Sequence, residues 1–486
     1  MSELPHVPLS AAAAAVPGSE VRGDRHVAIR EVAYDSRDVP PGSLFFCVTG
    51  ATEDGHRFAA PAVRSGAVAV VVERWLDLDV PQLRVPSVRR SMGPVSSVVF
   101  GEPARSMTTI GVTGTNGKTT VVHLLDAAFR AAGRTTGAIG TVGARVAGAP
   151  VPIARTTPEA PDLQRLLARM RSAGVTVVAM EVSSHALDQE RVAGLRFDAA
   201  VFTNLSQDHL DHHGSMEAYF AAKASLFDRD RARHAVLNLD DEGGRRLLQV
   251  PVPVTTYGLD PAADVRAVDV RAGPDGVAFR VDGREVTSPL RGAFNVSNCL
   301  AAMAVADRSG VDRATTIDAL ADPGSVPGRM EPVDAGQRFL VVVDYAHTPD
   351  SIRTVLAAAR PLTTGRVIVV FGCGGDRDRV KRFPMGAAAT EGADLTVITT
   401  DNPRSEDPSV IIAEVERGAA STGGRYVVEP DRRTAIRLAV AEAGPGDVVV
   451  IAGKGHETEQ ELGGRVVPFD DRVVAREELE AIGARG

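Results

Sequence analysis

A glycine- and threonine-rich segment holds the first residues whose types and spacing could do chemistry. It consists of Gly114, Thr115, Asn116, Gly117, Lys118, Thr119 and Thr120. Backbone N–H groups in such a turn point at anionic oxygens, a lysine supplies a mobile cation, and the hydroxyl that follows can reach Mg²⁺. The phosphates of ATP match all three features. The alternative is a glycine-rich turn with an exposed lysine, because strict P-loop spacing requires a glycine where this chain has Val112.

The residues on either side predict the elements that position this loop. Thr108 to Val112 is a short run of β-forming residues, and Val121 to Ala132 has helical spacing with Gly133 as a stop. A loop between a strand and the N-terminus of a helix is a common anion-binding arrangement. The flanking elements therefore favour a phosphate-binding loop.

Acidic and histidine residues follow two further predicted strands. Glu181 lies near the end of the strand Val175 to Val182, where a carboxylate suits a Mg²⁺ site that faces the loop. The polar run from Asn204 to His213 follows the predicted strand Ala199 to Thr203. An isolated run of this kind is usually a solvated turn, but its place after a strand favours a site.

Lys223 lies in a predicted helix that begins near Met216. Tyr219, Phe220 and Phe227 belong to the apolar face of that helix. A lysine on such a face can extend to solvent along its aliphatic stem, and the residue types alone leave that alternative open.

The last third of the chain contains four short buried-strand candidates, separated by helical stretches. They are Phe339 to Val343, Arg366 to Phe371, Leu395 to Thr399 and Asp447 to Ile451. This alternation predicts a doubly wound parallel sheet, which binds ligands at the carboxyl ends of its strands. Polar loops follow three of these strands, at residues 374–377, 401–404 and 453–457.

Composition limits the class of protein. The chain has 486 residues, enough for about three domains, and its apolar content is mainly Ala, Val and Leu with only 4% aromatics. These features favour an α/β fold with parallel sheets. The net charge of -8 and the mixing of both signs argue against nucleic-acid binding. The sequence shows neither a signal peptide nor an apolar run long enough for a membrane, and its three distant cysteines predict a reducing compartment, so we expect a cytoplasmic protein.

The segment TGTNGKTT resembles the variant P-loop of the Mur ligases and of the related folylpolyglutamate synthetases. The resemblance extends from about Val32 to Phe469, with further motifs in the expected order. It implies an α/β protein of three domains, namely a UDP-substrate-binding domain at 1–107, a central P-loop ATP-binding domain with a parallel sheet at 108–331, and a Rossmann-like amino-acid-binding domain at 332–486. We expect it to act as a monomer.

The Mur ligase pattern also implies an ATP site with Mg²⁺ as cofactor. Residues carried over to ATP binding, besides the P-loop, are Asn295 and Arg329. The implied catalytic residues are Lys118, Glu181, His209, Lys223, Asp344 and His347. Thr119, Glu181, His209 and a carbamylated Lys223 are the implied metal ligands, since a carbamate offers the oxygen atoms that Mg²⁺ prefers.

Two further sets of residues match substrate-reading positions of the Mur ligases. The set for the UDP-linked muramoyl peptide is Ser36, Thr156, Thr157, Ser183, Gln189 and Arg191. The set for diaminopimelate is Arg377, Asp401, Asn402, Pro403, Arg404, Gly453 and Glu457. A planar guanidinium such as that of Arg404 suits the distal carboxylate of a diamino diacid. The structural alternative is that Arg404 pairs with Glu406 or Asp407 on the loop surface.

The activity implied by this resemblance is an ATP-dependent amide-bond ligation. Diaminopimelate would be added to the D-glutamyl γ-carboxylate of UDP-MurNAc-L-Ala-D-Glu through an acyl phosphate, in peptidoglycan synthesis and hence in cell shape and division. The alternatives are the same chemistry with lysine, a folylpolyglutamate synthetase-like ligase, and a P-loop binding or regulatory module without catalysis.

Overall fold

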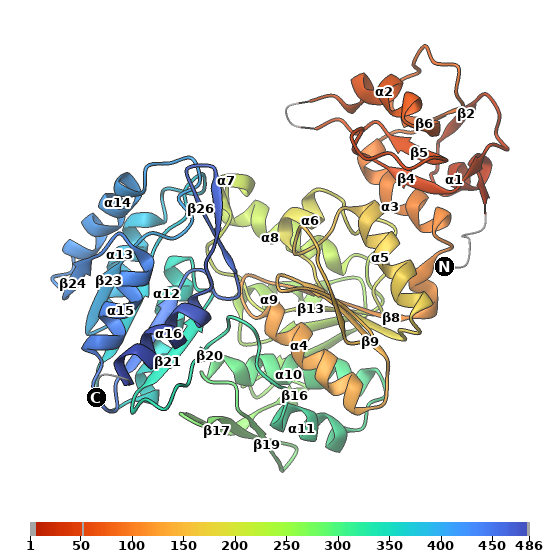
Figure 1. The fold of residues 1–486 in the computed structure, drawn as a ribbon. Helices are drawn as coiled ribbons and strands as arrows, with labels where there is room; N and C mark the ends of the chain where they lie inside the picture. The colour runs from red at the N-terminus through yellow and green to blue at the C-terminus, as the bar shows by residue number, and fades with distance from the viewer. Residues whose placement is uncertain (1–5, 51–52, 484–486) are drawn as a thin grey trace.

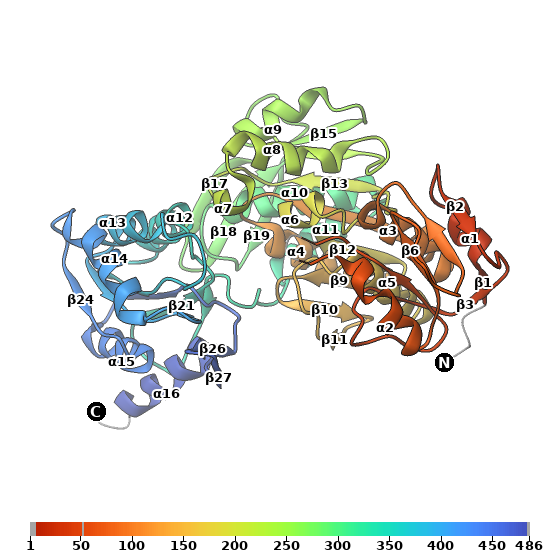
Figure 2. The ribbon, with the colours of Figure 1, turned by 90° about the horizontal axis from the view of Figure 1, so that it is seen from above.

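The computed structural model describes residues 6–50 and 53–483, which form a three-domain α/β protein (Figure 1). The first and third domains lie on opposite sides of the central domain in both views (Figure 2). The predicted fold class is therefore confirmed, while the boundaries after residues 107 and 331 stay predictions. None of the helices in the described ranges has the length and apolarity needed to cross a membrane.

The first domain is built on a sheet with the strand order β2-β7-β6-β5-β4, parallel except for β2. Its strands are β2 (Glu20–Arg22), β4 (Glu31–Ala33), β5 (Ser43–Phe46), β6 (Ala67–Val72) and β7 (Gln82–Arg84), while β1 (Val7–Pro8) pairs with β3 (Ala28–Ile29). Helices α1 (Leu9–Ala14) and α3 (Val88–Val99) contribute to one core cluster, and α2 (Ala59–Arg64) contributes to the other. The predicted strand at 67–72 is confirmed with the same bounds.

The central sheet has the order β11-β10-β9-β12-β8-β13-β14-β15-β16 and is parallel from β9 to β16. Its strands are β8 (Thr108–Thr113), β9 (Thr136–Gly140), β10 (Gly143–Val146), β11 (Ala149–Val151), β12 (Val177–Glu181), β13 (Ala199–Phe202), β14 (Ala235–Asn238), β15 (Val254–Gly258) and β16 (Val265–Arg266). A separate antiparallel sheet contains β17 (Val268–Gly273), β18 (Gly276–Val281) and β19 (Arg284–Ser288). The strands predicted at 108–112, 175–182 and 199–203 are thus present, with ends that differ by one or two residues.

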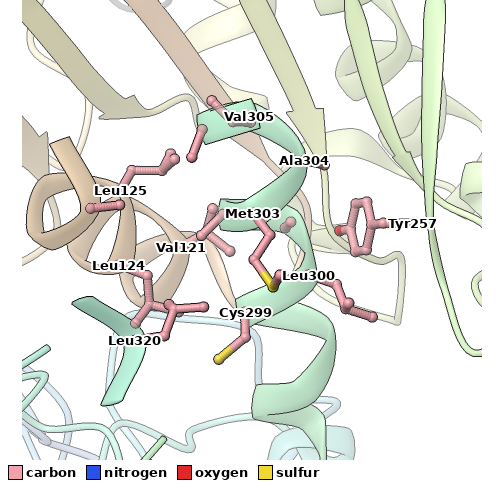
Figure 3. Close-up of a cluster of buried hydrophobic side chains, with 14 of the residues drawn as sticks. Val121, Leu124, Leu125, Tyr257, Cys299, Leu300, Met303, Ala304, Val305 and Leu320 are labelled. Atoms are coloured by element: carbon pink, nitrogen blue, oxygen red, sulfur yellow. The ribbon is translucent and has the colours of Figure 1, made fainter. Parts of the chain in front are cut away.

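Helices cover both faces of the central sheet. They are α4 (Lys118–Ala131), α5 (Ala160–Ser172), α6 (Ser184–Asp188), α7 (Leu210–His213), α8 (Met216–Ala224), α9 (Glu242–Arg246), α10 (Phe294–Arg308) and α11 (Arg313–Ala321). Figure 3 shows α4 packed against α10, with Val121 and Leu125 near Met303 and with Leu320 of α11 beside Leu124. This apolar contact fixes the helix that follows the P-loop, so the loop itself is held on a rigid support.

The third domain contains the doubly wound sheet that the sequence predicts. The strand order is β20-β21-β25-β22-β23-β24, parallel except for β20. Its strands are β20 (Glu331–Pro332), β21 (Leu340–Asp344), β22 (Val367–Phe371), β23 (Leu395–Ile398), β24 (Tyr426–Val428) and β25 (Val448–Ala452), and a hairpin adds β26 (Glu459–Leu462) and β27 (Arg465–Pro468). Helices α12 (Pro349–Ala359), α13 (Arg382–Gly392) and α14 (Pro408–Ala420) cover one face, and α15 (Arg432–Glu442) and α16 (Asp471–Gly483) cover the other.

Candidate active site

The P-loop connects β8 to α4 and depends on two glycines. Gly114 and Gly117 have φ angles of +145° and +86°. A Cβ atom would lie 1.8 Å from the Thr203 hydroxyl oxygen at the first position and 2.5 Å from Asn298 Oδ1 at the second. The loop therefore passes too close to Thr203, which follows β13, and to α10 for any larger residue, and its N–H groups are held at the start of α4, where anions bind.

Lys118 is folded back onto this loop. Its Nζ donates hydrogen bonds of 2.8 Å to the carbonyl oxygens of Gly114 and Thr115. Burial lowers the pKa of Lys118, and the nearby Glu181 carboxylate opposes that shift. Because both acceptors are neutral, an incoming phosphate oxygen would give the ammonium a stronger, charged partner.

Glu181 lies at the carboxyl end of β12, directly beside β8. Its side chain is 1% exposed, and its two oxygens accept hydrogen bonds from the N–H (2.8 Å) and hydroxyl (3.0 Å) of Thr141. A Cβ on Gly140 would lie 2.3 Å from the carboxylate, so the turn after β9 closes over it. Thr141 was not predicted as a site residue, because one threonine in a turn carries no chemical signal.

His209 immediately precedes α7 and has a left-handed conformation, with φ of +54°. Its Nε2 lies 3.4 Å from the Asp208 carboxylate, and its ring meets the His185 ring edge-on at 4.6 Å. Burial lowers the pKa of His209 to about 4, so the imidazole is neutral at physiological pH and keeps a lone pair for a metal ion.

Lys223 of α8 does not extend to solvent, so that alternative is wrong. The residue is 1% exposed, and its Nζ donates a 2.8 Å hydrogen bond to the Gly114 carbonyl oxygen. The Nζ atom also lies 4.4 Å from the centre of the Tyr219 ring. Burial and the neighbouring Lys118 hold the pKa of Lys223 well below its usual value.

The candidate metal ligands surround the P-loop but do not form a closed site by themselves. Within residues 6–50 and 53–483, no three His, Cys, Asp or Glu side chains are arranged to hold a metal ion. Thr119 lines a cleft together with His209, and it also lines an adjoining pocket together with Glu181. The donor set of hydroxyl, carboxylate and imidazole fits an ion whose remaining ligands come from phosphate, carbamate and water.

This cleft, with a volume of about 590 Å³, lies between the central and third domains. The central domain contributes the P-loop and Asn298, while the third domain contributes Asp344 and His347. Asn295, which the sequence assigns to ATP binding, lies behind the cleft wall, where its Oδ1 accepts a 2.8 Å hydrogen bond from Asn298. Asn298 is therefore the residue of this pair that faces the cleft.

Residues of the interdomain connection complete the cleft. Arg329 donates a 3.0 Å hydrogen bond to the Thr119 hydroxyl. The Asp344 carboxylate accepts hydrogen bonds of 2.8 Å from the N–H groups of Met330 and Ala346. Burial raises the pKa of Asp344 and lowers that of His347 to about 4. Arg329 thus contacts the first turn of α4 at Thr119, and its role in ATP binding stays a prediction.

The residues assigned to the muramoyl peptide gather beside Glu181, except for Ser36. The Thr157 hydroxyl donates to the Glu181 carbonyl oxygen (2.9 Å) and accepts from the Ser183 N–H (3.1 Å). Arg191 donates to Thr157 and to Gln189 at 3.2 and 2.6 Å. Thr156 lies next to Thr141, with 3.2 Å between their hydroxyl oxygens.

Ser36 lies in the first domain, in the turn that follows β4. In that turn the Asp38 N–H donates to the Asp35 carbonyl oxygen, and the carboxylate of Asp35 pairs with Arg37 at 2.6 Å. A nearby hydrogen bond joins the first two domains, because the Tyr34 hydroxyl donates to Asp162 of α5 at 2.6 Å.

Glu159 is a functional candidate that the sequence analysis missed. Its buried carboxylate lies 2.8 Å from Arg89 of α3, 3.3 Å from Arg155 and 3.1 Å from Arg191. Three guanidinium groups around one carboxylate leave an excess of positive charge beside Thr157, whose carbonyl oxygen accepts from Arg191. The single glutamate in TTPEA gave no sign of this, because its partners are distant in the sequence.

The residues assigned to diaminopimelate lie together at one edge of the third sheet. Asn402 donates a 2.8 Å hydrogen bond to Glu457. Lys454 is fully buried between them, with its Nζ 3.4 Å from an oxygen of each. Asp401 is buried close to Gly453, where a Cβ would lie 2.4 Å from the aspartate oxygen. Lys454 was not predicted, although it stands within the GKGHE motif.

Arg404 has partners other than those that the structural alternative proposes. Its Nη1 donates to the Gly375 carbonyl oxygen at 2.7 Å, and its Nε lies 3.7 Å from Glu461 of β26. Glu406 pairs instead with Arg382, and the Asp407 side chain accepts from the Ser409 N–H at the start of α14. The proposed surface pairs with Glu406 and Asp407 are therefore wrong. Arg377 is exposed and donates to the Asp376 carbonyl oxygen.

This combination of a P-loop and a cleft shared with a Rossmann-like domain defines a nucleotide-dependent enzyme of the three-domain ligase class. Three family models match the chain, at residues 28–95 (Mur ligase family, catalytic domain), 112–306 (Mur ligase middle domain) and 328–455 (Mur ligase, glutamate ligase domain). The chain belongs to the Mur ligase family, whose members are ATP-dependent ligases.

Relatives match over nearly the whole length. A UDP-N-acetylmuramoyl-L-alanyl-D-glutamate--2,6-diaminopimelate ligase of Geobacillus thermodenitrificans is 49% identical over 473 residues, 95% of this chain and 97% of the relative. The ligase of the same name from Streptomyces coelicolor is 47% identical and covers 94% of each chain. A solved structure of a ligase with that name matches with a TM-score of 0.70 and 34% identity, covering 99% of this chain and 100% of that one.

A folylpolyglutamate synthase of Mycobacterium tuberculosis, solved with ADP and AMPPCP, shares the fold more distantly. Its TM-score is 0.62 at 21% identity, over 75% of this chain and 92% of that one. The predicted Mur ligase family is confirmed by the three family models and by the relatives that match over nearly the whole length.

Proposed function

We propose that the chain joins diaminopimelate to the γ-carboxylate of the D-glutamyl residue in UDP-N-acetylmuramoyl-L-alanyl-D-glutamate, using ATP. The observation that carries this proposal is the convergence of the P-loop cleft and the amino-acid loops around Asp344. Its carboxylate lines the cleft, while its carbonyl oxygen accepts a 3.1 Å hydrogen bond from the Gly453 N–H. The relatives named above, which match over the full length, support the choice of substrates.

In the proposed reaction the D-glutamyl carboxylate is activated as an acyl phosphate, which an amine of diaminopimelate then attacks with release of phosphate. Lys118 and Arg329 approach the phosphate site from opposite sides and stabilise the charge that spreads over the transferring phosphoryl group. Enclosure between the domains excludes water, which would hydrolyse the acyl phosphate.

Mg²⁺ is the proposed cofactor, held by Thr119, Glu181, His209 and a carbamylated Lys223. A bound Mg²⁺ would neutralise phosphate charge. Carbamylation is supported by the setting of Lys223, because an ammonium buried against a neutral carbonyl and beside Lys118 is unfavourable there. A carbamate would replace this charge by an anion that Lys118 can attract.

The amino-acid choice rests on Arg377, Arg404 and Glu457, which stand on the loops that follow β22, β23 and β25 at one edge of the third sheet. A diamino diacid offers a carboxylate to the two guanidinium groups and an ammonium to Glu457, whereas lysine has no distal carboxylate. We further propose that the enzyme acts as a monomer in the cytoplasm in peptidoglycan synthesis. Its use of ATP and its free, buried thiols at Cys47, Cys299 and Cys373 fit that compartment.

The test is a phosphate-release assay with ATP, Mg²⁺ and the UDP-dipeptide, in which the amino acid is varied among diaminopimelate, lysine and glutamate. Turnover should depend on the dipeptide and be fastest with diaminopimelate. Lys118→Ala should abolish it, because the loop loses its phosphate cation. Preferential use of lysine, or of a folyl substrate with glutamate, would overturn the substrate assignment. A full rate in Lys118→Ala would remove the P-loop from the mechanism.

A further inference from the structure

Arg382 is a charged residue that the reaction above does not use, and its setting is unusual. It is the first residue of α13, and its side chain is 0% exposed. The guanidinium lies 2.8 Å from Glu406 and 2.8 Å from Glu414 of α14, and it donates a 3.3 Å hydrogen bond to the Gly374 carbonyl oxygen. A fully buried arginine needs such partners, because an unpaired buried charge is strongly unfavourable.

Two of the three partners of Arg382, Gly374 and Glu406, lie in the loops that carry the proposed specificity residues, and the third, Glu414, lies on α14. The first loop is residues 374–377, which end at Arg377, and the second is residues 402–407, which contain Arg404. Glu406 of the second loop accepts a 2.6 Å hydrogen bond from the Asp376 N–H of the first. Arg382 therefore contacts both loops, the first through Gly374 and the second through Glu406.

The two loops are also tightly joined to each other. The Gly375 N–H donates to the Asn402 carbonyl oxygen at 2.9 Å, and Ser405 donates from its N–H and its hydroxyl to the Asp376 carboxylate. A Cβ on Gly375 would lie 1.9 Å from the Pro403 carbonyl oxygen, so the backbones are in direct contact. The two loops are therefore joined through backbone and side-chain contacts.

Each loop contains one strained residue. Asp376 and Arg404 have φ angles of +52° and +53°, a left-handed conformation that non-glycine residues rarely adopt. Such conformations persist where the surroundings enforce them, and they concentrate at binding sites. The enforcing contacts here include the buried Arg382 pair with Glu406, two residues after Arg404.

We propose that Arg382 is a positioning residue that determines the amino-acid preference, because it holds the loops that carry Arg377 and Arg404 in one position relative to each other. This inference rests on the proposed function, since it assigns these loops to the amino-acid substrate. Arg382 itself does not touch the substrate. It acts through Gly374 and Glu406 on the orientation of two guanidinium groups, the exposed one of Arg377 and the half-buried one of Arg404.

The test uses the full-length variant Arg382→Lys, which keeps the charge but loses the planar fork that contacts two carboxylates and a carbonyl together. The KM for diaminopimelate should rise by about tenfold to a hundredfold, the effect of losing one charge-assisted hydrogen bond at the site. The KM values for ATP and the UDP-dipeptide should stay unchanged. Selectivity for diaminopimelate over lysine should fall by a similar factor.

Asp447→Asn provides the matched control. Asp447 is a buried carboxylate of the same domain that accepts from Arg366 and Gly444 just before β25, at the opposite edge of the sheet. The Asp447→Asn variant should have a lower melting temperature than the wild-type protein but the same KM for diaminopimelate. If Arg382→Lys cannot be purified as a folded protein, Glu406→Gln decides, because it removes the charged partner through which Arg382 contacts the second loop and keeps an oxygen that can accept from the Asp376 N–H.

Unchanged KM and selectivity in the folded variant would overturn the inference. Equal losses for all three substrates would also overturn it, since they would show a merely structural role. Failure of the proposed function has a different result, namely a wild-type enzyme that prefers another acceptor. In that case the same variants, assayed with the preferred acceptor, still test whether Arg382 controls its KM.

Discussion

The residues around the P-loop include two lysines, the half-buried Lys118 and the buried Lys223. The Nζ atoms of Lys118 and Lys223 both donate to the carbonyl oxygen of Gly114, each at 2.8 Å. Two ammonium groups that share one neutral acceptor repel each other unless an anion lies between them. The site is therefore suited to receive phosphate on one side and a carbamate on the other.

Lys223→Ala should be inactive, and short carboxylic acids such as acetate should partly restore turnover by supplying the missing oxygen ligand. Lys118→Ala is the matched control, because it lacks a cation and the same acids should not rescue it. Phosphate release with and without acetate gives the comparison, and mass spectrometry of the intact wild-type protein under bicarbonate tests for one added CO₂. An unmodified Lys223 in the fully active enzyme would refute the carbamate.

Arg404→Ala should weaken the use of diaminopimelate while ATP and the UDP-dipeptide bind normally. A bidentate guanidinium and carboxylate pair contributes about 1.5 to 3 kcal/mol, or roughly tenfold to a hundredfold in affinity. Arg404→Lys should restore little, because it loses the fork. Arg417→Ala, a change on α14, serves as control. Steady-state kinetics with varied amino acid measure the effect, and an unchanged KM for diaminopimelate in Arg404→Ala would contradict the assignment.

At the scale of helices and strands, most of the molecule follows from local sequence patterns. The buried runs at 67–72, 366–371 and 395–399 predict β6, β22 and β23 because continuous apolar segments suit a sheet covered on both faces. The start of α4 was predicted three residues late, at Val121 instead of Lys118. The first turn of that helix is polar because Lys118, Thr119 and Thr120 line the cleft, so it lacks the apolar spacing by which the rest of the helix is predicted.

The side-chain partners could not be predicted in the same way. Lys223 turns inward because its helix packs over the P-loop, a contact between residues 109 positions apart. Glu159, Lys454 and Arg382 likewise have partners from distant segments. Their roles depend on the folded arrangement of the loops, which no local pattern of residue types encodes.

Gly117→Ala should abolish nucleotide binding, and Gly133→Ala should not. Both glycines have positive φ angles, +86° and +73°, so alanine adds a similar backbone strain of about 1 kcal/mol at each. A Cβ at Gly117 would lie 2.5 Å from Asn298, whereas one at Gly133 would have nothing within 4 Å. Calorimetric titration with ADP separates the two effects. Equal affinities in the two variants would show that the close approach to α10 is dispensable for the nucleotide.

At the scale of the whole molecule, ion pairs between a small number of residues join the first and central domains. Arg165 of α5 lies 3.0 Å from Glu31 of β4, and Arg89 of α3 lies 2.8 Å from Glu159. Glu159 also contacts Arg191, which is proposed to bind the peptide. The domain interface and the peptide site therefore share one carboxylate, so a change at Glu159 affects both.

Glu159→Gln should lower the free energy of unfolding by about 3 kcal/mol, because the buried Arg191 loses its carboxylate partner. This value is at the lower end of the range for breaking a buried ion pair, since the other partner, Arg89, is partly exposed to water. Glu217→Gln is the control, since its exposed pair with Arg246 contributes about 0 to 1 kcal/mol. Urea unfolding should be followed by two probes, because a three-domain chain need not unfold in one step. The fluorescence of Trp75, the only tryptophan of the sequence, reports on the first domain, and circular dichroism reports on the whole chain. In Glu159→Gln the Trp75 transition should move to lower urea and the KM for the UDP-dipeptide should rise. Equal unfolding curves for the two variants would show that the carboxylate does not hold the domains together.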